Sequence, residues 1–388
     1  PIFFLPRTSL TIHNYCVPSG KWGPRHYIYK IFQKPPVLLE QVNPEFRLKV
    51  MKQRLAEMGH FDSDITLDVK VYGKDQKKAR AKYNIFFETA YRYRKLDFYN
   101  QGTRPDSIIA ASMPQSLIRP GIDYWVKDLE DERGRLSQIL KNHGHYYFNS
   151  DFLLFHADTA VGEKQVDLTL VIKDEISKKA YNPYTLRNVD VFVKALRKNR
   201  RKIIPNDSIY INDCYYKSVG SPFRPKVITR PISLKPGQSY TYTDHENTLR
   251  YLQGMQAFQS VTVSFSEVDS TSNQLDVQVE LVPIKPVQTG LELNFATKSN
   301  DFIGPAAIAT ISHMNVFRGA EQLTLQVDGG FEWQRRSKQR QYELGFNSYE
   351  IGSQLKLTIP RFLVPFNIRN QSPRYVPRTS TSSGVRRI

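Results

Sequence analysis

The feature that most constrains this 388-residue chain is a segment that occurs three times along its first three quarters. Each copy spaces apolar residues three and four apart, as one face of an amphipathic helix requires, and an aromatic residue follows. The copies cover residues 47–61, 132–147 and 248–258. In the first two, Gly59 and Gly144 stand where a left-handed residue ends a helix. The repetition predicts an array of similar modules rather than one large domain.

Apolar and polar residues alternate in two stretches after each helix, which predicts two strands of a half-buried sheet. These stretches are 65–71 and 81–87, then 152–154 and 166–172, then 261–265 and 275–281. The turns between them fall at Gly73, near Gly162 and at residues 269–273. Each copy therefore predicts a helix followed by a pair of strands.

A second landmark precedes the last two helices. Residues 116–124 and 233–240 each hold a basic residue, then Pro-Gly, then Tyr three residues after the Gly. Pro-Gly turns the chain, and the Tyr is placed to pack under the next helix. An opening strand is predicted before each landmark, at 91–98 and 184–193. The unit reads strand, helix, helix, strand, strand. A generic α+β hairpin repeated by chance is the alternative, and two shared landmarks per unit argue against it.

The last quarter has a different pattern, because the helical spacing disappears from Val287. About four strands are predicted here, at 291–295, 305–312 after a turn at 300–304, 323–333, and 342–359. In 323–333 the apolar residues share one parity and end in Phe331 and Trp333. A membrane sheet would turn that parity to lipid, the other to a wet lumen, and the aromatics to the boundary. A soluble sandwich with one wet face fits the periodicity equally well.

These features together resemble the BamA/TamA family of bacterial outer-membrane assembly proteins. The repeated unit is similar to the POTRA domain of that family, and residues 359–366 look like the Pro-Arg-hydrophobic ending of its early barrel strands. A further segment of this chain is similar to the turn that follows the second barrel strand in TamA-like proteins. The residues that carry this turn motif are Asn315, Phe317, Arg318, Gly319 and Glu321. Within the family, the chain most resembles the TamL-type translocation and assembly module protein of Bacteroidota.

The resemblance implies a fold class of tandem α+β POTRA modules (β-α-α-β-β), followed by antiparallel strands of an incomplete transmembrane β-barrel. The expected divisions are a linker or module remnant at 1–37, a partial POTRA-like module at 38–89, a second at 90–175, a third at 181–283 with an insertion or long loop at about 194–225, and the N-terminal part of the barrel at 287–388. The chain begins with Pro1 and shows no signal peptide, so we expect a fragment that lacks its start and its lipoprotein signal.

The resemblance also implies a function in the outer membrane, with the POTRA modules in the periplasm. Unfolded outer-membrane clients would add a strand to a sheet edge and be helped into the bilayer. The first barrel strand is the seam of the family, where a client strand would pair; its candidate residues are Gly290, Leu291, Leu293 and Phe295. A periplasm-spanning inner-membrane protein is a further candidate partner. A pore that secretes one dedicated protein is the alternative within the same family.

The net charge of +18 raises a third possibility, a soluble basic protein that binds nucleic acid. The Lys and Arg runs are short, however, and lie between apolar alternations, where solvated turns are expected. A basic surface also suits anionic lipid headgroups. We therefore expect no nucleic-acid partner. The sequence has no run of eighteen apolar residues, so it predicts no transmembrane helix. Membrane strands with alternating residues would escape that test.

No motif in the sequence predicts catalysis, a cofactor or a metal. There is no Gly-rich phosphate loop and no nucleophile elbow. His143 and His145 have metal-ligand spacing but no Cys or carboxylate cluster to complete a site, so a helix-end pair is the better interpretation. Cys16 and Cys214 are interpreted as incidental, and residues 130–132 as acidic groups that suit a helix start. We expect a protein that is not an enzyme.

Overall fold

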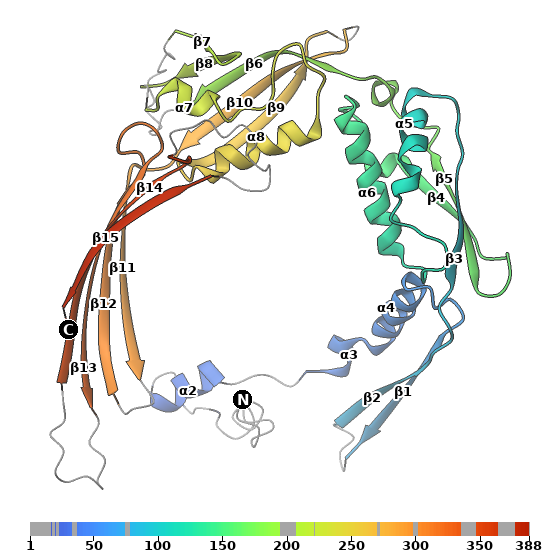
Figure 1. The fold of residues 1–388 in the computed structure, drawn as a ribbon. Coiled ribbons are helices and arrows are strands. Elements are labelled where there is room, and N and C mark those ends of the chain that lie inside the picture. Colours follow the sequence, from blue (N-terminus) through green and yellow to red (C-terminus); the bar gives the residue numbers. More distant parts are fainter. Residues whose placement is uncertain are drawn as a thin grey trace. The chain divides into compact units, whose positions relative to one another are not determined.

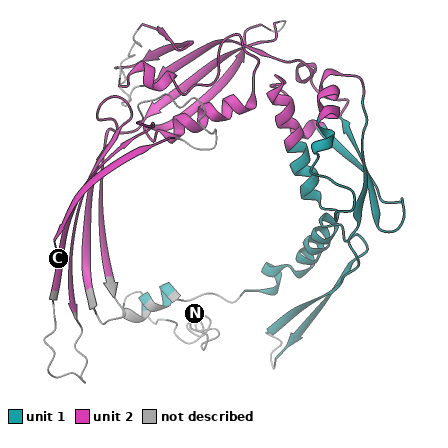
Figure 2. Ribbon diagram, viewed as in Figure 1, with its two compact units in different colours: residues 1–100, 112–134, 153–172 teal, residues 101–111, 135–152, 173–388 magenta. Residues whose placement is uncertain are grey.

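The structure is a computed structural model that describes residues 17, 20, 23–32, 37–73, 78–194, 207–220, 222–269, 272–297, 302–334, 347–363 and 377–387. The chain forms two compact units, drawn in Figure 2. Unit 1 comprises residues 1–100, 112–134 and 153–172, and unit 2 comprises residues 101–111, 135–152 and 173–388. The described helices include none that is long and apolar enough to cross a bilayer.

The first module, residues 38–89, is a helix on a hairpin, as predicted (Figure 1). Its elements are α3 (Leu39–Val42), α4 (Pro44–Glu57), β1 (Asp64–Tyr72) and β2 (Lys78–Phe86), with β1 and β2 antiparallel. The helix α4 begins with Pro44, and the Asn43 side chain accepts a hydrogen bond from the Phe46 N–H at 3.1 Å. Gly59 ends it with a φ of +80°. Upstream, the expected linker contains the short helix α2 (Pro24–Phe32).

The second and third modules have the predicted β-α-α-β-β order. Module 2 consists of β3 (Arg92–Phe98), α5 (Arg104–Ser112), α6 (Val126–Asn142), β4 (Leu153–Asp158) and β5 (Gln165–Ile172). Module 3 consists of β6 (Thr185–Val193), α7 (Pro225–Thr229), α8 (Tyr242–Gly254), β9 (Phe258–Glu267) and β10 (Gln274–Pro283). In each module the last strand lies between the other two, and it is parallel to the first strand of the module and antiparallel to the second. The boundary between the two units passes through α6.

The insertion in module 3 is more ordered than the expected long loop. Its described part forms β7 (Ile209–Ile211) and β8 (Cys214–Ser218), an antiparallel pair. Because β8 pairs in parallel with β6, the sheet grows to the order β7-β8-β6-β10-β9. Strands this short carry little periodicity of their own, so the sequence alone does not reveal them.

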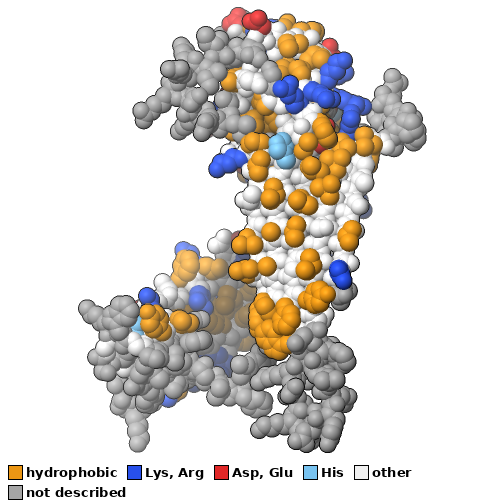
Figure 3. All heavy atoms as spheres, turned by 90° about the vertical axis from the view of Figure 1, so that its left-hand side faces the viewer, with side chains coloured by type: hydrophobic (Ala, Val, Ile, Leu, Met, Phe, Trp, Pro, Cys, Tyr) orange, Lys and Arg blue, Asp and Glu red, His pale blue; other side chains and the backbone are white. Residues whose placement is uncertain are grey.

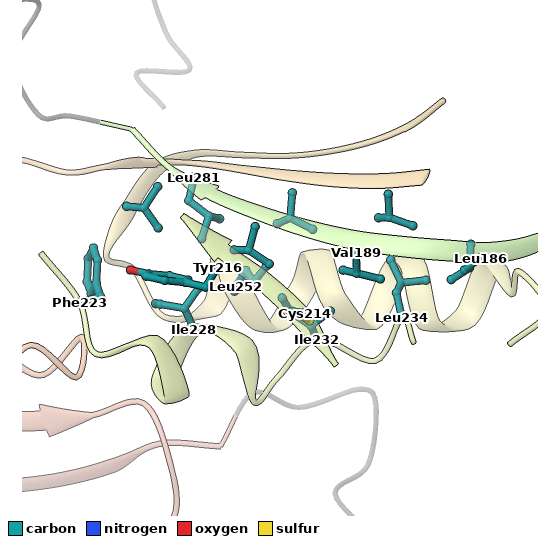
Figure 4. Close-up of a cluster of buried hydrophobic side chains, with 14 of the residues drawn as sticks. Leu186, Val189, Cys214, Tyr216, Phe223, Ile228, Ile232, Leu234, Leu252 and Leu281 are labelled. Atoms are coloured by element: carbon teal, nitrogen blue, oxygen red, sulfur yellow. The ribbon is translucent and has the colours of Figure 1, made fainter. Parts of the chain in front are cut away.

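The core of module 3 lies between this sheet and its helices (Figure 4). Strand β10 buries every second residue from Leu275 to Leu281, and β6 does the same from Val189 to Val193. Leu252 of α8 packs against them and is fully buried. Cys214 also lies in this core, where burial raises the pKa of its thiol to about 12. The thiolate, which is the reactive form of cysteine, is therefore disfavoured at this position.

Successive modules are joined by a repeated backbone pattern. At the first joint the carbonyl of Gly59 accepts a hydrogen bond from the Tyr91 N–H at 2.9 Å, and the Tyr91 carbonyl accepts from Tyr124 at 2.7 Å. At the second joint the Gly144 carbonyl accepts from the Tyr184 N–H at 2.9 Å, and the Tyr184 carbonyl accepts from Tyr240 at 2.9 Å. The glycine, the tyrosine that directly precedes the next strand and the landmark tyrosine thus form one structural device, which the chain uses twice.

The described strands between residues 287 and 387 form one antiparallel sheet, which we call the terminal sheet (Figure 1). Its strands are β11 (Val287–Thr297), β12 (Phe302–His313), β13 (Gln322–Gln334), β14 (Asn347–Ile359) and β15 (Thr379–Arg387), paired in chain order. The expected number of about four strands was too low by one. Strand β15 was missed because its sequence is rich in Ser and Thr and has Val385 as its one large apolar residue. The predicted alternation at 342–346 lies outside the described residues.

The second joint predicts how two glycines differ in their tolerance of alanine. Both Gly144 and Gly162 have a φ above +90°, so Ala costs about 1–2 kcal/mol at either. A Cβ at Gly144 would also lie 2.7 Å from the Ser239 Oγ and 3.0 Å from the Pro183 Cβ, whereas a Cβ at Gly162 meets open space. Gly144→Ala should therefore cost a further ~1–3 kcal/mol, read from urea unfolding. Equal losses in the two variants would contradict this description of the joint.

Candidate functional site

The terminal sheet has one apolar face. Among the side chains that the structure describes on its strands, thirteen large apolar ones are exposed, and the strand registers place all thirteen on the same face. They are Val287, Leu291, Leu293, Phe295, Ile311, Leu325, Val327, Phe331, Trp333, Tyr349, Ile351, Leu355 and Val385. Figure 3 looks onto this face, where apolar side chains extend along the strands. A continuous apolar surface of this kind marks an interaction site or contact with a membrane.

The opposite face of the terminal sheet is mostly polar. Asp328, Gly352 and Arg386 are register partners on neighbouring strands. The Arg386 guanidinium lies 2.8 Å from a Glu350 carboxylate oxygen and 3.5 Å from one of Asp328. Gly352 lacks a side chain where the Asp328 carboxylate needs room, since a Cβ there would approach an Asp328 oxygen to 2.6 Å. Charged groups and water therefore belong on this side, as the alternation predicts.

The dimensions of the strands suit a bilayer. Strands β11 to β14 contain 11, 12, 13 and 13 residues, and a tilted strand of about 9–11 residues crosses the hydrocarbon core. The Trp333 ring lies 6.5 Å from the Phe295 ring and 5.9 Å from the Phe331 ring, between centroids. These aromatics cluster at one end of the apolar face, where an aromatic girdle would meet the membrane boundary.

The predicted seam residues lie on an edge of this sheet. Strand β11 pairs with β12 on one side, and no other described strand pairs with it. Leu291, Leu293 and Phe295 all point to the apolar face, with Leu293 77% exposed. Gly290 belongs to the polar parity, opposite Thr310. The structure thus gathers all four residues on one edge strand, and pairing with a client there remains a prediction.

The predicted turn motif holds the terminal sheet to module 3. The Asn315 side chain donates to the Pro222 carbonyl at 2.8 Å and accepts from the Ala320 N–H at 2.9 Å. The Arg318 carbonyl accepts a hydrogen bond from the Arg224 N–H at 2.9 Å. The Glu321 carboxylate is buried and accepts from the Gly319 N–H at 2.8 Å.

Each of these motif residues has its own place in the turn. A Cβ at Gly319 would lie 2.1 Å from a Glu321 oxygen, so alanine there would force the Glu321 carboxylate to move. Phe317 and Arg318 are exposed. The motif is a clamp built from backbone groups and two polar side chains, the half-buried Asn315 and the buried Glu321. Sequence reasoning found the motif but not the surface of module 3 that it contacts.

The landmark Pro-Gly turns close one edge of the sheet in each of modules 2 and 3. In module 2, the Tyr93 N–H donates to the Ile122 carbonyl at 2.9 Å, and the Gly121 N–H donates to the Tyr93 carbonyl at 2.7 Å. In module 3, Leu186 makes the corresponding bonds with Gln238 at 2.8 Å and Gly237 at 2.7 Å. These bonds use the outer backbone groups of β3 and β6. An incoming strand therefore has no free partner at those positions.

The opposite edges stay open. Strand β4 pairs with β5 alone and β9 pairs with β10 alone among the described strands. In module 3 the insertion covers the rest of β6 with β8, so the remaining edges are the three-residue β7 and the ten-residue β9. An unpaired strand edge is a ready template for another strand. The longest open edge in the modules is β9.

The titratable groups of the described residues do not converge on one cleft. They hold no group of three or more His, Cys, Asp or Glu that could bind a metal ion. His143 is exposed, while His145 is buried and its Nδ1 lies 3.1 Å from the Ala180 carbonyl oxygen. Burial lowers the pKa of His145. The two rings thus occupy different environments, which suits the expected helix-end pair.

Comparison with solved structures finds weak likenesses. POTRA domains 3–5 of BamA from Haemophilus influenzae are 13% identical, with 61% of this chain and 79% of that chain covered and a TM-score of 0.36. BamA from Haemophilus ducreyi lacking POTRA domains 1–3 is 10% identical, with 76% of this chain and 58% of that chain covered and a TM-score of 0.39. CdiB from Acinetobacter baumannii is 9% identical, with 89% of this chain and 63% of that chain covered and a TM-score of 0.27. No family model and no curated protein matches the chain.

The clamp predicts a difference between two residues of the turn motif. Asn315→Ala leaves the Pro222 carbonyl and the buried Ala320 N–H without their partners, which should cost about 1–3 kcal/mol. Phe317→Ala removes a ring that is 55% exposed and should change stability by less than about 0.5 kcal/mol. Thermal unfolding followed by near-ultraviolet circular dichroism measures both. If the two variants unfold alike, the turn does not hold the sheet to module 3.

Proposed function

We propose that this chain is the client-receiving part of an outer-membrane assembly factor of the BamA/TamA type. In this proposal the modules lie in the periplasm and bind unfolded barrel proteins by strand addition, while the terminal sheet lies in the outer membrane and helps their insertion. The role is non-catalytic. On its turn motif, residues 315–321, we further assign the chain to the TamL-type branch.

One observation carries the proposal: a module with a long open edge leads directly into a sheet with a lipid-like face. Strand β10 ends at Pro283 and β11 begins at Val287. Transfer of thirteen half-exposed apolar side chains from water to hydrocarbon contributes on the order of 10 kcal/mol. A water-soluble role would leave that contribution unused. The membrane is therefore the environment that best satisfies the terminal sheet.

The open edge of β9 suits reversible capture of unfolded chains. Main-chain hydrogen bonds at an edge accept almost any client sequence. Each such bond contributes about 0.5–1.5 kcal/mol net, and ordering each client residue costs about 1–2 kcal/mol of backbone entropy. These terms nearly cancel, so a client strand on β9 is held weakly and can move on. Weak capture is what a factor that passes clients into a membrane requires.

The lipid face can be tested with two neighbouring residues on opposite faces. Leu293→Arg places a charge on the apolar face and should cost ~2–4 kcal/mol in the bilayer, with loss of folded protein from the outer-membrane fraction. Asn294→Arg places the same charge on the polar face and should be tolerated. Heat-modifiable gel mobility reports the folded fraction. Equal tolerance of both variants would rule out lipid contact on this face.

Strand addition can be tested by proline at β9. Thr262 and Ser264 have N–H groups that point to one side of the strand, and Val261 and Val263 have N–H groups that point to the other. Proline at a position whose N–H points toward β10 should lower the melting temperature of the protein. Proline at the outward parity should leave the fold intact but remove a donor that a client needs.

The readout for the outward-parity proline is the outer-membrane proteome of cells that carry the variant in place of the native protein. Broad loss of barrel proteins is the expected result. Loss of a single exported protein would instead favour a dedicated secretion pore. If neither parity changes the proteome while the outward variant folds normally, β9 does not receive clients.

A further inference from the structure

A cavity of about 240 Å³ lies where the insertion of module 3 meets the turn between β12 and β13. Its apolar part is formed by Ile209 of β7 and by Phe223, which precedes α7. Arg224 and Arg318 line it as well, and the backbone hydrogen bond between these two residues keeps them together. None of this lining belongs to β9 or to the apolar face of the terminal sheet, although Ile209 lies on the short edge strand β7. The cavity therefore asks for a separate explanation.

One polar group of the cavity lining, the hydroxyl of Tyr216, is buried. Its residue is 2% exposed, and the hydroxyl has no hydrogen-bond partner within the described part of the chain. In Figure 4 this oxygen points toward Phe223, which also lines the cavity. Burial raises the pKa of Tyr216, and the nearby Ser218 hydroxyl, although it lacks hydrogen-bond geometry, lowers it by less. A buried hydroxyl without a partner is unfavourable, and a ligand oxygen would satisfy it.

The charges around the cavity favour an anion. Arg224 and Arg318 contribute two positive charges and Asp207 contributes one negative charge, which leaves a net charge of +1 in the lining. Within the described residues, neither guanidinium forms an ion pair. Guanidinium groups match the planar geometry of a carboxylate and bind it with charge-assisted hydrogen bonds. A single carboxylate balances the net charge of the lining.

We propose that this cavity binds a small amphiphile that carries an apolar body and one carboxylate. Tyr216 donates a hydrogen bond to the carboxylate, Arg224 and Arg318 neutralise it, and the apolar body packs on Ile209 and Phe223. At about 30 Å³ per water-sized group, the volume holds roughly eight non-hydrogen atoms, which is the size of hexanoate. Two sources share this chemistry, namely a free fatty acid and the carboxyl-terminal residue of a peptide.

The test is isothermal titration calorimetry of the full chain in detergent with sodium hexanoate. Hexanol and hexylammonium serve as ligand controls, because they keep the apolar body and remove or invert the charge. N-acetylleucine represents a peptide carboxyl terminus. Saturable binding of a carboxylate, with much weaker binding of hexanol and hexylammonium, is expected. Tighter binding of hexanoate points to a fatty acid, and tighter binding of N-acetylleucine points to a peptide end. If neither ligand shows saturable binding, the proposal is overturned.

Variants separate a binding site from a merely structural one. Tyr216→Phe keeps the ring and should lower the affinity for the carboxylate ligand about fivefold or more. The melting temperature of the unliganded protein should stay the same or rise. Arg224→Gln should lower the affinity for the carboxylate ligand about tenfold or more. Tyr215→Phe on the exposed side of the same strand is the control and should change neither quantity. If Tyr216→Phe binds hexanoate as tightly as Tyr215→Phe does, or if hexanol binds as tightly as hexanoate, the site does not exist.

Discussion

Backbone hydrogen bonding at strand edges is the constraint on which the rest of this structure depends. Every sheet in the chain ends in strands whose outer N–H and C=O groups need a partner, water or a covering segment. Modules 2 and 3 satisfy the first part of one edge internally, through the Pro-Gly turns at Gly121 and Gly237. The insertion extends this cover along β6, and the opposite edges at β4 and β9 remain open. What is closed and what is open thus follows from a few turns, and the proposed client sites are the edges that remain.

The terminal sheet combines the same constraint with a second one, the alternation of its side chains. The period of two along each strand, held in register across five strands, sorts apolar groups to one face and polar groups to the other. In hydrocarbon no water can satisfy an open edge, so β11 and β15 each need a partner strand there. The Asn315 side chain and the Arg318 carbonyl bond the sheet to module 3, and both parts belong to unit 2.

Much of this arrangement could be predicted from the sequence, because it rests on periodicity and on residues with special backbone needs. Gly59 and Gly144 end their helices at positive φ, and the alternations at 166–172 and 275–281 form strands that pair on both sides. Features without a period of their own escaped prediction. Strand β15 is too polar, β7 and β8 are too short, and the contact of the turn motif with Pro222 joins residues 93 positions apart. The Tyr216 cavity was equally hidden, because burial and an unpartnered hydroxyl are properties of packing.

The central claim is that the terminal sheet has lipid on one face and water on the other. Its most direct test is the accessibility of nitroxide spin labels placed one at a time from Gln288 to Phe295 of β11, with the protein in lipid bilayers. Collisions with oxygen, which dissolves in lipid, should be highest at the odd-numbered positions, and collisions with a water-soluble nickel chelate should be highest at the even-numbered ones. A profile without a period of two, or nickel access at Leu291 and Leu293 equal to that at their neighbours, would contradict the claim.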